Sequence, residues 1–181
     1  MTPLITSFPP AARVASPLVQ EGVRMYQQFE KEAFQYGLVG ILGGAKADKL
    51  GYLVNILKRI RALRQQGNTV LFRFHLVGAL AYPVMQAQGL PIGRSLMPTK
   101  EEDKRKVAKA LPELLALMSD PLLRDVVVLP QDHLVQAPDG TERVVGQSEI
   151  GEHDTAIDVR EETVASIRRD EEPLRRQGRG G

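Results

Sequence analysis

Short apolar runs alternate with amphipathic segments through the middle of this chain, and this alternation constrains the fold more than any other feature. The runs at residues 38–42, 69–74 and 125–129 have the length and composition of buried strands in a parallel sheet. Between them, apolar residues recur every three or four positions, which is typical of helices that pack on a sheet. The sequence therefore predicts βαβ units in an α/β fold, with a mostly parallel sheet and helices on both faces.

The expected helices are residues 18–34, 48–66, 78–88 and 101–118, and the second of these has the clearest apolar stripe (Leu50, Leu53, Leu57 and Ile60). Pro83 must lie in a first helical turn or kink its helix, and Pro112 implies a kink or break. A turn is expected at residues 138–140, with short strand candidates at 144–145 and 156–157.

A length of 181 residues corresponds to one domain with its ends. Residues 1–17 hold four prolines and are expected to form an extended arm. Residues 18–167 are expected to form the domain. Residues 168–181 are rich in charge and glycine, and we expect a disordered tail there.

Composition excludes several classes of site and partner. The chain has no cysteine, so disulfides, thiolate nucleophiles and cysteine-ligated metals are excluded. No apolar run is long enough to span a bilayer, so membrane insertion is not expected. The 24 basic and 22 acidic residues nearly balance and aromatic residues are 5%, which does not favour a specific nucleic-acid partner. The N-terminus lacks the pattern of a signal peptide, so a cytoplasmic protein is expected, with an organellar matrix as the alternative.

The segment Gly43-Gly44-Ala45-Lys46-Ala47-Asp48-Lys49 follows the first predicted strand, where ligands bind in open α/β sheets. Paired glycines let backbone N–H groups approach an anion, and the following helix start and the two lysines favour phosphate. The segment is neither a Walker motif nor GxGxxG. From spacing alone, a plain strand-to-helix turn with two surface lysines is the favoured interpretation.

The histidines and acidic clusters give no catalytic or metal motif. His75, His133 and His153 are far apart in the sequence; we expect His75 in the core and His133 in a solvated loop. The acidic clusters at residues 101–103 and 170–172 are expected to be a helix start and part of a solvated tail. No catalytic residue and no metal ligand is assigned.

Five segments in the same order resemble motifs of the phosphoglycerate kinase family. Residues 41–50 resemble its ILGGAKVxDKI, residues 78–82 its GGGMAYTF, and residues 87–96 its AQGxxIGxSL. Residues 129–132 resemble LPVD, and residues 157–163 faintly resemble DIGPxT. The resemblance covers roughly residues 15–167 and implies part of the three-layer, Rossmann-like nucleotide lobe of such a kinase.

The resemblance also implies a set of site residues and a cofactor. Gly43, Gly44 and Ala45 would border the nucleotide, and Lys46 and Lys49 would lie near its phosphates. The adenine pocket would lie along residues further on (Gly78, Ala79 and Leu80). The implied ligand is ATP or ADP with magnesium, bound weakly or not at all.

The sequence departs from the family's pattern at these positions. Two residues separate Lys46 from Lys49 where the family has three, which rotates the second lysine by roughly 100° on a helix. The triple glycine has become Val77-Gly78-Ala79, and the DIGPxT segment has lost its glycine and proline. The lobe that binds 3-phosphoglycerate and the WNGPxGxFE and GGGDT segments have no counterpart in the sequence, so phosphoryl transfer by this chain alone is not expected.

Two hypotheses follow. In the first, which we favour, the chain is a catalytically inactive kinase-like domain. It is then a binding or structural module of a larger assembly, with residual nucleotide binding and a protein partner that covers the incomplete sheet. In the second, it is a functional half of a phosphoglycerate kinase completed by a separate chain.

Overall fold

A computed structural model describes residues 17–46 and 48–177 of the chain. The chain divides into two compact units, Met1–Gly37 and Leu38–Gly181. The first contains helix α1 (Pro17–Tyr36), close to the helix predicted at 18–34, which therefore belongs to a different unit from the rest of the predicted 18–167 domain. The predicted arm lies outside the described residues except for Pro17, which begins α1.

A parallel sheet of three strands forms the centre of the second unit, in the order β1-β2-β3. Its strands are β1 (Leu38–Leu42), β2 (Phe72–Leu76) and β3 (Val127–Val128). Leu38 pairs with Phe72 and Leu42 with Leu76, so β1 and β2 end together. The α/β class and the parallel sheet are thus confirmed.

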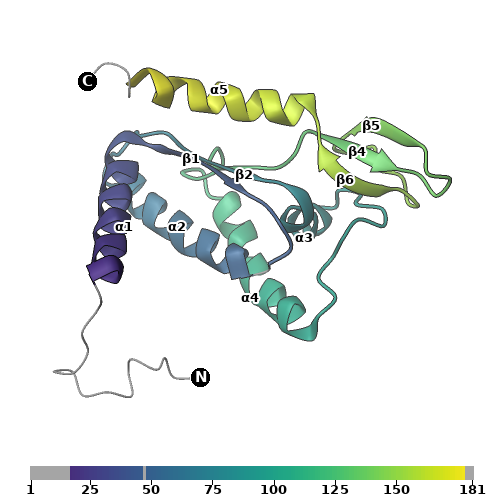
Figure 1. The fold of residues 1–181 in the computed structure, drawn as a ribbon, viewed down its shortest axis with the longest axis horizontal. Coiled ribbons are helices and arrows are strands. Elements are labelled where there is room, and N and C mark those ends of the chain that lie inside the picture. Colours follow the sequence, from purple (N-terminus) through teal and green to yellow (C-terminus); the bar gives the residue numbers. More distant parts are fainter. Residues whose placement is uncertain (1–16, 47, 178–181) are drawn as a thin grey trace. The chain divides into compact units, whose positions relative to one another are not determined.

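Helices cover both faces of this sheet, as predicted. Figure 1 shows α2 (Asp48–Gln65) and α4 (Glu101–Met118) on one face and α5 (Glu161–Gln177) along the other. The predicted stripe of α2 is fully buried. Helix α4 continues through Pro112, so the predicted break does not occur. Pro83 lies in the first turn of the short helix α3 (Tyr82–Ala87), which follows the 3₁₀ turn η3 (Gly78–Leu80).

A second sheet was not predicted. It is antiparallel, in the order β5-β4-β6, and its strands are β4 (Asp132–Gln136), β5 (Glu142–Gly146) and β6 (Thr155–Val159). The two short strand candidates lie in β5 and β6, and the predicted turn joins β4 to β5. The expectation of a mostly parallel sheet therefore holds only for the first of the two sheets.

The expected disordered tail is helical as far as it is described. Helix α5 extends to Gln177, and residues 178–181 lie outside the described residues. Two ion pairs, Glu171–Arg175 and Glu172–Arg176, each join residues about one helical turn apart and stabilise this charged segment. The Asp170 carboxylate is also hydrogen-bonded to the buried His75 side chain. The charges that suggested disorder are therefore spaced to stabilise a helix.

Candidate functional site

The candidate site lies at the carboxyl ends of β1 and β2, where ligands bind in α/β sheets. Two loops leave the sheet there, one from Leu42 toward α2 and one from Leu76 toward η3. The Val77 N–H donates to the Leu42 carbonyl at 2.9 Å, so the loops start side by side. The geometry therefore brings the glycine segment and the Gly78–Leu80 segment together, although 34 residues separate Gly43 from Gly78.

Both glycines of the first loop are required by the backbone. A side chain at Gly43 would overlap Val77, and Gly44 has a φ of 89°, a conformation that residues with side chains rarely adopt. Gly78 also has a positive φ, 58°. Gly43 is therefore required by close packing against Val77, whereas Gly44 and Gly78 are favoured by their backbone conformation, and Gly78 borders open space.

Lys49 is bound within the same loop. Its ammonium donates a hydrogen bond to the Gly43 carbonyl and is half-buried. The shortened spacing between the lysines thus places Lys49 against the loop backbone, while Lys46 is exposed.

A hollow of about 260 Å³ opens beside the two loops. Three of the predicted site residues line it: Ala45, Lys46 and Ala79. Gly43, Gly44, Gly78 and Lys49 lie outside this lining, and Leu80 is buried in the core. The structure therefore brings the predicted residues close together, but only three of them line the hollow.

Apart from Leu96, the end of a resembling motif, the rest of the hollow comes from a segment that the sequence did not single out. Leu96, Met97, Pro98, Thr99 and Lys100 lead into α4, and Asp103 lies in its first turn. The motif resemblance ended at Leu96 and the predicted helix began at Glu101, so this intervening loop carried no signal of its own. Lys46 and Lys100 give the hollow two cations, and neither has a hydrogen-bond or ion-pair partner in the described part of the chain.

The segment after α3 contacts β6 through residues of the predicted AQGxxIGxSL-like motif. The Ser95 hydroxyl accepts a hydrogen bond from the Ala156 N–H at 3.0 Å, and the Arg94 N–H donates to the Asp154 carbonyl at 2.7 Å. Gly93 has a φ of 53° and lies against the carbonyls of Gly151 and Asp154, in the segment before β6, where a side chain would overlap them. This motif therefore holds the loop that lines the hollow against the second sheet.

Asp132 and Thr163, from the last two resembling motifs, are hydrogen-bonded to each other. The buried Asp132 carboxylate accepts the Thr163 hydroxyl at 2.6 Å and the backbone N–H groups of residues 160, 162 and 163 at the start of α5. Burial alone would raise the pKa of the Asp132 carboxyl, but these hydrogen bonds lower it below its ordinary value. The pair fastens α5 to β4 and lies apart from the hollow.

The histidines differ in their agreement with prediction. His75 is in the core, as expected, and its Nε2 lies 2.9 Å from Asp170. His133 was expected in a solvated loop, but it lies in β4 and is 1% exposed. Burial lowers the pKa of both side chains, so both are neutral at neutral pH.

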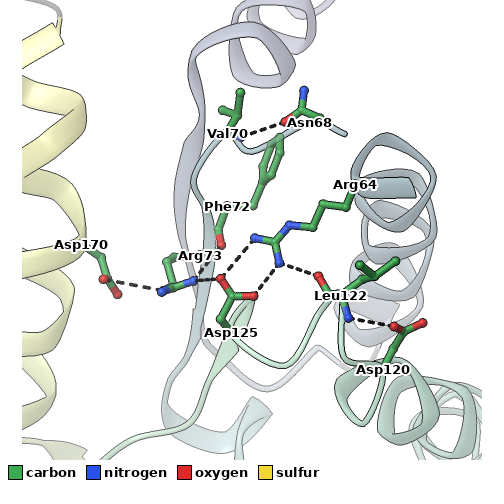
Figure 2. Close-up of polar contacts among 9 residues, drawn as sticks. All are labelled: Arg64, Asn68, Val70, Phe72, Arg73, Asp120, Leu122, Asp125 and Asp170. Atoms are coloured by element: carbon green, nitrogen blue, oxygen red, sulfur yellow. Dashed lines mark hydrogen bonds and ion pairs between the residues drawn. The ribbon is translucent and has the colours of Figure 1, made fainter. Parts of the chain in front are cut away.

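A second charged cluster joins β2, α2 and the segment before β3 (Figure 2). Asp125 accepts both Arg64 Nη1 and Nη2, at 2.5 and 3.2 Å, and Arg73 Nη1 at 2.6 Å. Partial burial would raise the pKa of Asp125, yet the two arginines lower it to about 2. The cluster pairs its own charges, which is the pattern of a structural network rather than a ligand site.

No described helix is long and apolar enough to cross a membrane. Across residues 17–46 and 48–177, no three histidine, aspartate or glutamate side chains gather as metal ligands would.

Comparison with known proteins decides the family. The sequence model of phosphoglycerate kinase matches residues 3–171. The chain belongs to the phosphoglycerate kinase family. The hollow therefore lies in a kinase-family domain, as the motif resemblance implied.

Similar curated proteins share the family's name. The chain is 40% identical over 98 residues to a phosphoglycerate kinase from Solibacter usitatus, covering 54% of this chain and 19% of that protein. It is 34% identical over 132 residues to one from Lactobacillus delbrueckii subsp. lactis, covering 70% and 27%. The chain thus spans about a quarter or less of the length of these relatives.

Solved structures show the same fold. Phosphoglycerate kinase from Coxiella burnetii superposes with a TM-score of 0.51 at 21% identity, covering 83% of this chain and 34% of that one. The enzyme from Pyrococcus horikoshii superposes with a TM-score of 0.52 at 16% identity, covering 80% and 35%. At these identities the likeness concerns the fold alone.

Proposed function

We propose that this chain is a phosphoglycerate-kinase-like binding module that holds a nucleotide weakly and does not transfer a phosphoryl group by itself. The observation that carries the proposal is the hollow beside the Gly43–Lys46 loop, lined by the exposed ammonium groups of Lys46 and Lys100, which have no partner among the described residues. Lys46, which follows the carboxyl end of β1, and Lys100, which directly precedes α4, suit the phosphates of a nucleotide.

The electrostatics around the hollow support the same ligand. The first turn of α4 borders it, and the positive end of a helix favours an anion, although the three acids of that turn (Glu101, Glu102 and Asp103) offset part of this attraction. Magnesium usually binds nucleotides through phosphate oxygens and one or two carboxylates. Asp103, which lines the hollow, would hold the metal of a bound magnesium nucleotide and would compensate its charge.

The geometry also supports weak binding and the absence of turnover. Lys49 is hydrogen-bonded to the Gly43 carbonyl, so a phosphate would have to displace that bond to recruit the second lysine. Ala79 adds a side chain to the wall where the family has glycine. Phosphoryl transfer depends on positioning and charge stabilisation, and one free lysine at the glycine loop provides less of both.

Calorimetric titration with magnesium ADP, followed by a coupled kinase assay with ATP and 3-phosphoglycerate, tests the proposal. We expect saturable binding that weakens about tenfold or more in Lys46→Met, because a charge-assisted hydrogen bond contributes about 1.5–3 kcal/mol. Lys58→Met removes a half-exposed lysine of α2 that pairs with Glu113 of α4 and does not line the hollow; it is the control and is expected to bind like the wild type.

The two assays separate the alternatives. Saturable binding without turnover supports the proposal. Absence of binding by the wild type, or equal binding by Lys46→Met, would contradict the nucleotide role. Turnover by the chain alone would contradict the inactive module, and turnover only on adding a separate chain that binds 3-phosphoglycerate would favour the second hypothesis, a completed kinase half.

A further inference from the structure

A larger hollow, of about 640 Å³, lies along β3, at the end of the parallel sheet opposite β1. All of its lining residues belong to the Leu38–Gly181 unit. Among the described residues, it shares none with the hollow beside the Gly43–Lys46 loop. Its volume is within the range of sites that bind small molecules. This β3 hollow is therefore a candidate site separate from the proposed nucleotide site.

The polar lining of the β3 hollow comes from several elements. Helix α5 contributes Ser166, Arg169 and Asp170, which share one face because residues three and four positions apart are neighbours on a helix. Three more charged residues come from β2 and from the segment before β3 (Arg73, Arg124 and Asp125). The packing of α5 over the sheet thus brings charges together that are distant in the sequence.

The two carboxylates of the β3 hollow are already bound by arginines. Asp125 accepts hydrogen bonds from Arg64 and Arg73. The Arg73 Nε also lies 3.7 Å from the Asp170 carboxylate, so Arg73 joins the two aspartates, as Figure 2 shows. This network of two arginines and two aspartates has no net charge. A cationic ligand would therefore have to displace an arginine to reach a carboxylate.

Arg124 and Arg169 differ from this network, because neither has a hydrogen-bond or ion-pair partner in the described part of the chain. Both side chains are exposed, and they add two positive charges to the lining. The carboxyl end of α4 at Met118 borders the same hollow, but its partial charge is only about −0.5. The balance favours an anion, and the guanidinium group is suited to bind phosphate through two parallel hydrogen bonds.

Uncharged polar groups make up the rest of the polar lining and suit a ligand with hydroxyl groups. The side-chain amides of Gln88, Gln131 and Gln147 have no hydrogen-bond partner among the described residues. Ser166, which is 8% exposed, adds a hydroxyl group. An amide both donates and accepts hydrogen bonds, as a ligand hydroxyl does, whereas a carboxylate ligand could only accept. The lining therefore favours a ligand that carries hydroxyl groups beside its anion.

We propose that the β3 hollow binds a small phosphorylated polyol, with its phosphate held by Arg124 and Arg169 and its hydroxyl groups held by the three glutamines. Arg73 remains bound to its two aspartates and forms part of the wall. The inference does not depend on the proposed nucleotide role, because the two hollows have different linings.

Calorimetric titration of the chain with glucose 6-phosphate, in a buffer without phosphate, tests this site. Inorganic phosphate and glucose are titrated separately, because they are the two halves of the probe. We expect saturable binding of glucose 6-phosphate and no measurable binding of glucose. Inorganic phosphate should bind at least tenfold more weakly than glucose 6-phosphate, because it makes none of the hydrogen bonds of the hydroxyl groups.

Substitution of the two unpartnered arginines locates the binding. Arg124→Gln and Arg169→Gln are each expected to weaken binding at least tenfold, because each removes a charge-assisted hydrogen bond. Both side chains are exposed, so the fold should be unchanged, which circular dichroism and thermal unfolding check. Arg168→Gln is the matched control. It removes the same charge from the neighbouring exposed residue of α5, which does not line the hollow, and should bind like the wild type.

The outcomes separate this inference from the nucleotide proposal. Weakened binding in both arginine variants, with wild-type binding in Arg168→Gln, supports the β3 hollow whether or not magnesium ADP binds. Absence of saturable binding by the wild type, unchanged binding in either arginine variant, or inorganic phosphate that binds as tightly as glucose 6-phosphate would overturn the proposal. Loss of binding in Lys46→Met would also overturn it, because the probe would then occupy the proposed nucleotide site.

Discussion

At the scale of single residues, the prediction for His133 differs most from the structure. It follows Pro130-Gln131-Asp132, which is typical of a loop, yet β4 begins at Asp132 and carries His133 into the core. Neither of its ring nitrogens has a hydrogen-bond partner among residues 17–46 and 48–177, although the Tyr82 ring lies 6.2 Å away and Asp132 is adjacent. A buried imidazole without a partner decreases the stability of the folded chain.

This predicts that the free energy of unfolding depends on pH, and that His133→Leu should make it depend on pH less. Burial lowers the pKa of folded His133 below 6.5, so the unfolded chain binds more protons as the pH falls below that value. Stability is therefore full above about pH 6.5 and declines at lower pH. We expect His133→Leu to raise the free energy of unfolding by about 1 kcal/mol at pH 7 and by more at pH 5.

Urea denaturation at several pH values measures this effect. His153→Leu, which changes an exposed histidine, is the control and should keep the wild-type pH dependence. His75, whose pKa is also lowered by burial, leaves a residual slope in the His133 variant. A less stable His133→Leu, or an unchanged slope between pH 7 and 5, would show that the imidazole has a favourable partner.

At the scale of elements, the helices were more predictable than the strands. The predicted stripe of α2 needed only the spacing of its leucines, and α4 has the predicted bounds because its charged start is followed by regularly spaced leucines. The second sheet was missed because its strands are short and β4 lacks an alternating pattern, so pairing between distant segments decides its existence. Helix α5 was not predicted: residues 161–167 carried no helix prediction, and the charges from residue 168 on were interpreted as a solvated tail, whereas they pair along the helix.

The attachment of α5 to the second sheet gives a prediction at this scale. Asp132→Ala should lower the free energy of unfolding by about 2 kcal/mol, because it leaves three backbone N–H groups at the helix start and the Thr163 hydroxyl without their acceptor. Hydrogen exchange should show faster opening of α5 than of α2.

Glu161→Ala is the matched control for this variant. Glu161 is an exposed acid in the first turn of the same helix, and its loss should change stability by less than about 0.5 kcal/mol. Equal effects of the two substitutions would show that helix-end charge, rather than the buried Asp132 contacts, holds α5 in place.

At the scale of the whole molecule, the candidate site was predictable only in part. Ala45, Lys46 and Ala79 could be identified because they lie in motifs after strands, where parallel topology collects loops. Lys100 and Asp103 could not, because they reach the hollow only through the path of the loop that Ser95 fastens to β6. Lys46 and Lys49 differ in position because of the turn that Gly43 and Gly44 form. The shortened spacing between the two lysines predicted that they would differ, but not where each would lie.

The central claim is that a nucleotide binds at this hollow, and an NMR titration with magnesium ADP tests it most directly. We predict that backbone amide signals of residues 43–46, 78–80, 96–97 and 99–103 shift in a saturable manner, while those of the Arg64–Asp125 cluster and α5 do not change. Saturable shifts confined to other parts of the chain, or no shifts at all, would contradict the account.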